Sequence, residues 1–499
     1  MKQHSGELFE LIQGLTLSEK RYCSLHLQKH SGARGNRYAR LFDFLCKQQV
    51  YDTVLAKAYM SYQNKPNHYA VLKKQLFEQL LDALYQYDLF SNAGQQLLRG
   101  IHQCHLLLQK GLFKACERRI KSLARTAEQM NHYEAQLQLQ QLKMMMKARN
   151  YYRNETEAGL KHWADETDAI VEQLKTTNRY RYLSSRVFKI QYESGARGRQ
   201  QAERMDEVLQ LPEFTSEIMA NNNRAKLDYL QVKALYHFTA LETEKAVDYN
   251  ARFLQLLDDN PILLQQHADR YFSVLNNYLI DCLVLKRYDT LATGLQKMRT
   301  LPQVTAFKRL ANFEANVFRL GYVLELNYMI GSGNYADAYK AIPDIIAGFN
   351  KFGDRIVKHN RITLQYLMAY ACFMLKRYDE ALGHLQHILQ EKETAVAENI
   401  QLAARMLQLL CHYEKGDYLL LDSLIKSVRR YLKADKSADI QRAVISFIQP
   451  AIRGVIPVTA KWMLLQNKLQ KLSAGGATAA GMSMFNYREW VERKVGPGQ

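Results

Sequence analysis

Apolar residues recur at helical spacing along most of the chain. The clearest segment, residues 366–390, reads YLMAYACFMLKRYDEALGHLQHILQ. Apolar positions repeat every three to four residues on both sides of a short Lys-Arg turn, and Tyr378 opens the second stretch, which predicts two packed helices. Ala369 and Ala381 place small side chains where the helices would approach closely, and Leu385 supplies an apolar contact. This segment therefore predicts a helix pair.

The same frame recurs elsewhere in the chain. The turns that end at positions 288, 335, 378 and 418 are 47, 43 and 40 residues apart. A repeating unit of this kind indicates an array in which each helix pair packs on its neighbours. The residues that take the turn and packing positions in the other units are Gly333, Tyr335 and Ala338 in SGNYADA, Gly416 and Tyr418 in KGDYLLL, and Tyr288 in LKRYDTL.

These residues resemble the tetratricopeptide repeat (TPR). That family places a small residue in the first helix, a Gly-x-Tyr turn, and then Ala and an apolar residue on the second helix, as at Ala369, Tyr378, Ala381 and Leu385. The resemblance covers roughly residues 95–435 and implies an all-α superhelix, or solenoid, whose groove binds a peptide or helix of a partner protein. The family repeat is about 34 residues long, so the units here are longer. Gln365 stands where the family has a large aromatic residue.

Prolines and glycines punctuate these helices sparsely, with 8 prolines and 24 glycines in 499 residues. Long elements with few breakers favour helices over strands. Pro212, Pro261 and Pro302 each follow an apolar-periodic segment, where a helix is expected to stop. Pro343 lies inside an otherwise helical run, and it predicts a kink or a break there.

Residues 1–92 differ from the repeats and predict a separate helical bundle. Thr16 and Glu19 form a capping box, in which each side chain caps the other residue's amide at the start of a helix. Three further helices are expected at residues 37–47, 51–60 and 68–87.

Two interpretations of this N-terminal bundle stay open. A repeat array needs terminal caps with a polar outer face, which favours a cap that covers the first repeat. The order of the helices also allows a helix-turn-helix, whose last helix would present Lys73 and Lys74 to nucleic acid.

The predicted repeat array, residues 93–435, is followed by three further segments. Residues 436–472 are expected to form capping helices, and the Gly/Ala-rich residues 473–484 a flexible linker. Residues 485–499 hold a short amphipathic helix in which Tyr487 and Trp490 share a face. This helix either docks on its own chain or serves as a tethered peptide for a partner's groove.

Charge is distributed unevenly along the chain. The net charge is +19, with +13 over residues 1–200, +8 over residues 401–499 and a nearly neutral middle. A basic surface suits an acidic partner or nucleic acid. No apolar run reaches the roughly 20 residues of a membrane span, and residues 1–10 do not read as a signal peptide. Seven scattered cysteines without a Cys-x-x-Cys pair agree with the cytoplasm as the expected location.

The basic stretch at residues 178–200 is the strongest candidate contact region. It interleaves Tyr180, Tyr182, Phe188 and Tyr192 with basic residues. This composition suits a phosphate backbone with stacked bases, or an acidic peptide. Alternatively, the aromatic residues face the core and the charges are a solvated helix face. A second basic stretch at residues 426–436 allows the same two interpretations, a contact with a partner or a solvated helix face. The candidate basic contacts of the first stretch are Arg179, Arg181, Arg186, Lys189, Arg197 and Arg199.

Motifs for catalysis or metal binding are weak in this chain. His26 and His30, and His384 and His387, share helix faces, but the sequence specifies no third ligand near either pair. No phosphate-binding glycine loop or local nucleophile and base pair occurs. We therefore expect no enzyme activity, no cofactor and no metal. The sequence favours a protein-protein interaction scaffold, with a nucleic-acid-associated regulator as the alternative.

Overall fold

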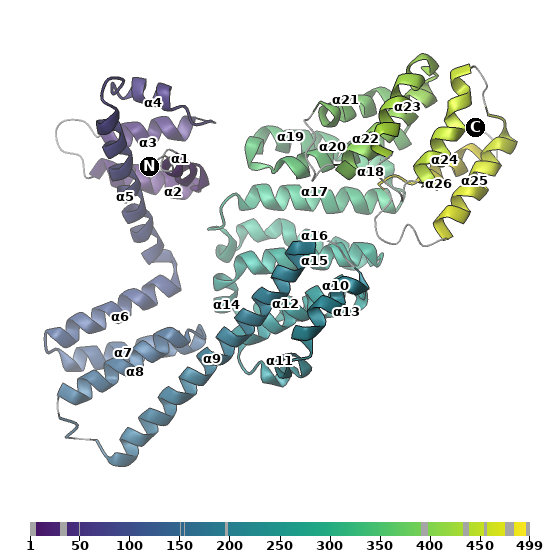
Figure 1. The fold of residues 1–499 in the computed structure, drawn as a ribbon. Coiled ribbons are helices and arrows are strands. Elements are labelled where there is room, and N and C mark those ends of the chain that lie inside the picture. The colour runs from purple at the N-terminus through teal and green to yellow at the C-terminus, as the bar shows by residue number, and fades with distance from the viewer. Residues whose placement is uncertain are drawn as a thin grey trace. The chain divides into compact units, whose positions relative to one another are not determined.

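The computed structural model describes residues 6–29, 37–48, 50–149, 151–153, 155–194, 198–390, 398–432, 439–453, 457–474 and 484–495. These residues form helices and turns, and no β-strand occurs among them, which confirms the all-helical prediction (Figure 1). The chain divides into two compact units. Unit 1 comprises Met1–Val274 and Val304–Phe313, and unit 2 comprises Leu275–Gln303 and Glu314–Gln499. The division falls inside the predicted repeat array, where no change in composition marks it.

The helices follow one another with short connections. Those of unit 1 are α1 (Glu7–Gly14), α2 (Leu17–Lys29), α3 (Arg37–Lys47), α4 (Thr53–Tyr59), α5 (Pro66–Ser91), α6 (Ala93–Gln109), α7 (Phe113–Gln129), α8 (Tyr133–Arg149), α9 (Glu157–Ser194), α10 (Arg199–Leu209), α11 (Pro212–Thr215), α12 (Asn223–Thr239), α13 (Thr243–Asp258) and α14 (Pro261–Gln266). The boundary between the units passes through α15 (Ala268–Val284). The helices that follow it are α16 (Tyr288–Thr300), α17 (Phe313–Gly331), α18 (Tyr335–Lys340), α19 (Ile342–Phe352), α20 (Lys358–Met374), α21 (Tyr378–Leu389), α22 (Glu398–Lys415), α23 (Tyr418–Leu432), α24 (Asp439–Ile448), α25 (Thr459–Ala474) and α26 (Tyr487–Val495).

The N-terminal helices begin where their capping groups require. The predicted capping box is confirmed, because the Thr16 amide donates to Glu19 Oε2 at 2.7 Å and the Glu19 amide donates to Thr16 Oγ1 at 3.3 Å. α3 has the predicted bounds. α4 is shorter than predicted, since Asp52 caps it by accepting from the amides of Val54 and Leu55. α5 is longer at both ends than predicted.

α5 supplies the main apolar face of this N-terminal bundle. One stripe of its side chains is buried at the spacing of a helix facing a core. The bundle therefore has its own hydrophobic cluster, to which α1 to α5 contribute. The buried stripe of α5 is Tyr69, Leu72, Leu76, Leu80 and Ala83.

One tight turn, in which the next helix starts two residues after a left-handed residue, recurs seven times between consecutive helices of the described chain. In each, a residue with positive φ follows the helix, and the next amide donates to the carbonyl five residues back, as Asn334 does to Met329. This pattern is the Schellman motif, which satisfies the free carbonyls at a helix end. The next helix starts within two residues of the left-handed position, so the turn reverses the chain. The left-handed residues are Gly111, Asn131, Leu241, Lys286, Gly333, Lys376 and Gly416.

Prolines end or start helices as the sequence predicts. Pro212 and Pro261 occupy the first turns of α11 and α14, just after α10 and α13 end. Pro343 breaks the helical run into α18 and α19, because proline has no N–H for the bond to the preceding turn. The predicted break at this position is confirmed.

Consecutive helices pack on one another within each unit. In unit 1, α6 packs on α7, α7 on α8, α8 on α9 and α12 on α13. In unit 2, α20, α21, α22 and α23 pack in chain order. No helix in the described part of the chain is long and apolar enough to cross a membrane.

Candidate binding sites

The residues that the sequence assigns to repeat packing lie at helix contacts. Ala369, Ala381, Leu385 and Ala338 are fully buried, and Tyr335 is nearly so. Tyr378 and Tyr418 open α21 and α23 and pack against the same hydrophobic cluster of unit 2, and the Tyr288 ring lies 5.1 Å from that of Tyr328. Gly333 and Gly416 occupy left-handed turn positions, with φ of 75° and 80°.

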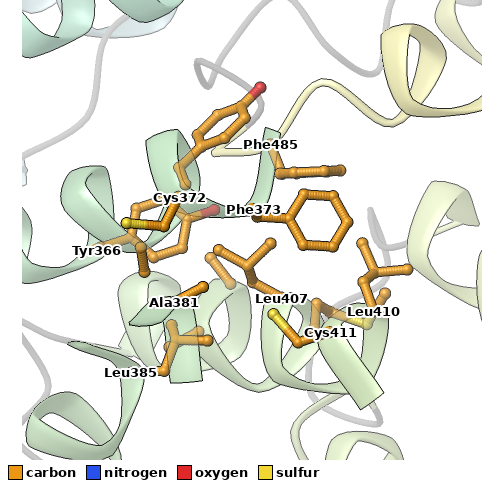
Figure 2. Close-up of a cluster of buried hydrophobic side chains, with 14 of the residues drawn as sticks. Tyr366, Cys372, Phe373, Ala381, Leu385, Leu407, Leu410, Cys411 and Phe485 are labelled. Atoms are coloured by element: carbon orange, nitrogen blue, oxygen red, sulfur yellow. The ribbon is translucent and has the colours of Figure 1, made fainter. Parts of the chain in front are cut away.

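The second half of α20 is buried on every side. Every residue from Tyr366 to Met374 is buried. A helix that is apolar on every side needs neighbours on every side. Figure 2 shows side chains of α20, α21 and α22 gathered in one cluster, which Phe485 from the C-terminal segment joins beside Phe373. The two rings are 5.4 Å apart.

The C-terminal segment, Met484–Val495, covers the remaining side of α20. The Tyr366 hydroxyl donates to the Met484 carbonyl at 2.7 Å, and the Asn486 amide donates to the Tyr370 hydroxyl at 2.9 Å. Burial raises the pKa of Tyr370 to about 12, so its hydroxyl stays protonated. Phe485 is only 2% exposed. We call the surface that holds this segment the unit 2 seat.

Glu414 of α22 anchors α26 at this seat. Its carboxylate accepts from Trp490 Nε1 at 2.8 Å and from Lys494 Nζ at 2.7 Å, and its side chain is 7% exposed. Tyr378 donates to the same carboxylate at 3.3 Å. The Trp490 ring also packs on Trp462 of α25 at 5.2 Å. A buried carboxylate that is fully hydrogen-bonded fixes the position of the helix that donates to it.

Two more contacts close the seat. The Tyr335 hydroxyl donates to Glu489 at 2.5 Å, and Arg493 donates to the Met374 carbonyl at 2.8 Å. The Arg493 guanidinium lies over the Tyr335 ring at 5.1 Å. Of the two interpretations of the C-terminal helix, the structure therefore shows docking on its own chain. Within the predicted linker, residues 475–483 lie outside the described residues.

Unit 1 contains a pocket of about 640 Å³ that four arginines line. Arg181 comes from α9, Arg224 from the start of α12 and Arg270 from the start of α15. Arg309 comes from the turn after the 3-10 helix η3 (Thr305–Phe307). We call it the arginine pocket. Among the candidate basic residues that the structure describes, only Arg181 lies in it.

Three of the four guanidiniums of the arginine pocket have carboxylate partners. Arg181 has no hydrogen-bond or ion-pair partner among the described residues, and it acts on buried Asp228 only through space. Burial raises the pKa of Asp228, and Arg270 offsets part of that effect. The pairs are Arg270 with Asp228 at 2.8 Å, Arg309 with Asp88 at 3.0 Å and Arg224 with Glu134 at 3.4 Å.

Arg224 is the least satisfied of the paired arginines. Its side chain is 13% exposed, and its bonds to Glu134 and Gln266 are both 3.4 Å long, near the limit for a hydrogen bond. Its Nε is buried without a partner in the described chain. Nearby His267 has a buried Nε2 in the same condition, and burial lowers its pKa to about 4, so the imidazole is neutral at pH 7. Weakly paired buried charge is costly.

Four of the other candidate basic residues near α9 form ion pairs with glutamates. The aromatic residues of the same stretch differ in exposure, since Tyr182 and Tyr192 are 55% and 90% exposed and Tyr180 is buried. Arg197 lies outside the described residues. Ion pairs join Arg179 to Glu213, Arg186 to Glu207, Lys189 to Glu193 and Arg199 to Glu203.

The two N-terminal candidates differ in environment. Lys73 is half-buried, its ammonium donates to the Tyr51 hydroxyl at 3.4 Å, and it lies over the Tyr69 ring at 5.5 Å. Lys74 is exposed. Only Lys74 therefore has a side chain fully available to a partner.

The histidine pairs do not assemble into a metal site in the described chain. His384 Nδ1 lies 2.9 Å from Gln365 Oε1, and nearby Glu380 pairs with Arg377. His30, the partner of His26, lies outside the described residues. Within the described ranges, no group of three or more histidine, cysteine or acidic side chains is arranged to hold a metal ion.

Comparison with known proteins gives no indication of function, so functional inference rests on the geometry of these sites. No family model, no curated protein and no solved structure matches this chain.

The central residues of the arginine pocket and of the unit 2 seat could not be predicted from the sequence. Arg224, Arg270, Arg309 and Glu414 stand in no motif, because each lies on a different element and meets its neighbours only through tertiary packing. A weak local signal existed for the seat, since a helix as apolar as residues 366–374 requires cover on two sides.

Proposed function

We propose that this chain is a non-catalytic protein-protein interaction scaffold whose TPR-like helix pairs bind a peptide or helix of a partner protein. The observation that carries the proposal is the unit 2 seat. It holds a short aromatic helix through buried Phe485 and Trp490 and through hydrogen bonds to Glu414. Anchoring aromatic residues in a groove formed by other helices is a recurring mode of peptide recognition.

The seat also indicates what the partner segment would look like. It would carry an aromatic residue to replace Phe485 and a tryptophan with a basic residue four positions later to bind Glu414, as Trp490 and Lys494 do. Because the docked segment belongs to the same chain, a partner would have to compete with it at high effective concentration.

The cytoplasm is the location we propose for this scaffold. All seven cysteines are free, and six of them are buried. Such thiols behave as small apolar side chains, and a reducing compartment keeps them in that state.

The experiment is affinity capture from native lysate with the wild-type chain and with two variants that open the seat, Trp490→Ala and Lys494→Glu. We expect both variants to retain a protein more strongly than the wild type does. A synthetic peptide of residues 484–495 should release it, and a scrambled peptide should not. Circular dichroism checks that the variants keep their helices.

Two results would count against this proposal. Absence of any retained protein across several salt concentrations would remove the scaffold function. Retention that the 484–495 peptide does not compete would place partner binding outside the seat.

A nucleic-acid-associated role is the second candidate. Exposed Tyr182 and Tyr192 lie on α9 together with Arg181, whose guanidinium has no partner among the described residues, which is the composition of a stacking surface. If this role holds, the chain binds random duplex or single-stranded oligonucleotides, with an affinity that falls steeply as salt rises. Fluorescence anisotropy measures this, and no binding at low salt rejects the role.

A further inference from the structure

The arginine pocket of unit 1 holds guanidinium groups that the surrounding side chains do not fully pair. Of its four guanidiniums, Arg181 has no partner among the described residues and Arg224 has only two contacts of 3.4 Å. Unit 1 therefore concentrates unsatisfied cationic donors in a single cavity.

The backbone around this pocket adds to the same field. Residues at the starts of α6 and α15 line it, namely Ala93 and Gly94 at α6 and His267 and Arg270 at α15. The positive end of a helix dipole lies at its N-terminus and favours a bound anion, although at α6 the Asn92 side chain already accepts from the amides of Gly94 and Gln95. His267 contributes no charge of its own at neutral pH, so the arginines and the two helix ends set a positive potential, which Asp228 in the lining partly offsets.

An apolar wall completes the pocket. Phe188 of α9 is 40% exposed and lines the cavity together with Met130 and Ile262. At about 640 Å³ the cavity lies within the range of roughly 300–1,000 Å³ that holds small ligands. A ligand that fills it would have an anionic end and an apolar or planar end.

We propose that the arginine pocket binds a small organic phosphate, with the phosphate on the guanidiniums of Arg181 and Arg224 and the organic part against Phe188. A phosphate monoester offers three strong acceptor oxygens and close to two negative charges, which suits several converging guanidiniums better than a single carboxylate does. The pocket lies wholly in unit 1, so this inference is independent of the unit 2 seat.

AMP serves as the probe, because it joins a phosphate monoester to a planar ring. Calorimetric titration of the full chain at low salt is expected to show binding that inorganic phosphate competes. Arg181→Ala removes an exposed side chain without partners, so the variant is expected to fold. It should weaken AMP binding about tenfold or more, which corresponds to about 1.4 kcal/mol.

Three further variants distinguish binding of AMP in the pocket from nonspecific electrostatic attraction to the basic surface. Arg199→Ala removes the same charge from the outer surface, where Arg199 pairs with Glu203, and should leave AMP binding unchanged. Phe188→Ala should weaken binding of AMP and leave binding of inorganic phosphate unchanged. Arg181→Lys keeps the charge but loses the two-pronged guanidinium, and it should restore only part of the affinity.

Three outcomes would overturn the proposal. The first is no heat of binding for millimolar AMP at low salt. The second is an equal loss of affinity in Arg181→Ala and Arg199→Ala. The third is citrate, a polycarboxylate without phosphate, binding as tightly as AMP.

Discussion

Single residues shape this chain most directly at its seven helix-reversing turns. Each turn needs one residue in the left-handed conformation, which costs an L-amino acid with a side chain about 1–2 kcal/mol. Glycine fills three of these positions, at Gly111, Gly333 and Gly416, and other residues fill the rest. The sequence showed the turns at Gly333 and Gly416 as Gly-x-Tyr frames and those at Lys286 and Lys376 as Lys-Arg-Tyr frames, but it gave no such sign of the turn at Asn131.

Gly416→Ala tests this conformational requirement. The added Cβ would have open space around it, so the cost comes from the backbone, where φ is 80°. We expect a loss of about 1 kcal/mol in the free energy of unfolding, measured by urea denaturation followed by circular dichroism.

Gly383→Ala is the matched control for this substitution. Gly383 lies inside α21, and its Cβ would also meet nothing within 4 Å. Alanine should stabilise that helix by about 0.5–1 kcal/mol. The turn requirement would be wrong if both alanines changed stability in the same direction.

A single residue, His267, makes the stability of the fold depend on pH. Its pKa falls from 6.5 to about 4, first because burial disfavours the cation and then because Arg270, Arg224 and Arg181 face it, opposed only by Asp269. Between these two pH values, His267 therefore binds a proton in the unfolded chain but not in the folded chain. The stability from this residue is complete above pH 6.5 and is lost as the pH falls from 6.5 to about 4.

We expect this histidine to cost the fold about 1–2 kcal/mol at pH 5 relative to pH 7. Urea denaturation at a series of pH values measures the effect. His267→Gln cannot titrate, so its stability should fall less between pH 7 and pH 5. Identical profiles for the variant and the wild type would contradict the assignment.

At the scale of elements, the docking of α26 is the feature that explains the most about its neighbours. It accounts for the burial of Tyr366 to Met374 of α20 on every side, since α21 and α22 cover one side and the C-terminal segment covers another. The sequence predicted the amphipathic helix but left its docking partner open. Both alternatives share the same local pattern, so only the contacts with Tyr366, Tyr370 and Glu414 distinguish them.

Trp490→Ala tests this docking. The substitution removes the ring contact with Trp462 and the bond to Glu414, and should lower the stability of unit 2 by about 2–4 kcal/mol. Arg488 and Arg493 are exposed even when α26 is docked, but release and unwinding of α26 would make the peptide bonds after them accessible to trypsin. Limited proteolysis with mass spectrometry should show faster cleavage there than in the wild type.

Leu419→Ala is the control for Trp490→Ala, because Leu419 is 98% exposed and its truncation removes little packing. Its cleavage rate should equal that of the wild type. An unchanged cleavage rate in Trp490→Ala would show that the tryptophan does not hold the segment in place.

At the scale of the whole molecule, the cysteines report on burial across both units. Burial raises the pKa of Cys23 to about 12 and of Cys46 and Cys104 to about 11, and it also raises that of Cys372. At neutral pH these groups are thiols rather than the nucleophilic thiolates.

We therefore expect a thiol reagent to label the native chain slowly at pH 7.5 and to label all seven cysteines at once in guanidinium chloride. Intact mass spectrometry counts the labels. Cys46, the one cysteine that is not fully buried, should react first. Rapid native labelling of Cys104 or Cys372 would contradict the packing of the unit that contains it.

The sequence by itself determined the helices, many of their ends and most of the reversing turns. These depend on interactions within about five residues, such as the Thr16–Glu19 capping box and the proline that separates α18 from α19. Only the tertiary structure decided the division into two units, the docking of α26 and the arginine pocket. Arg181 and Arg309 meet at one pocket although they are far apart in the chain. No local pattern encodes such a meeting, because it results from the packing of several helices of unit 1.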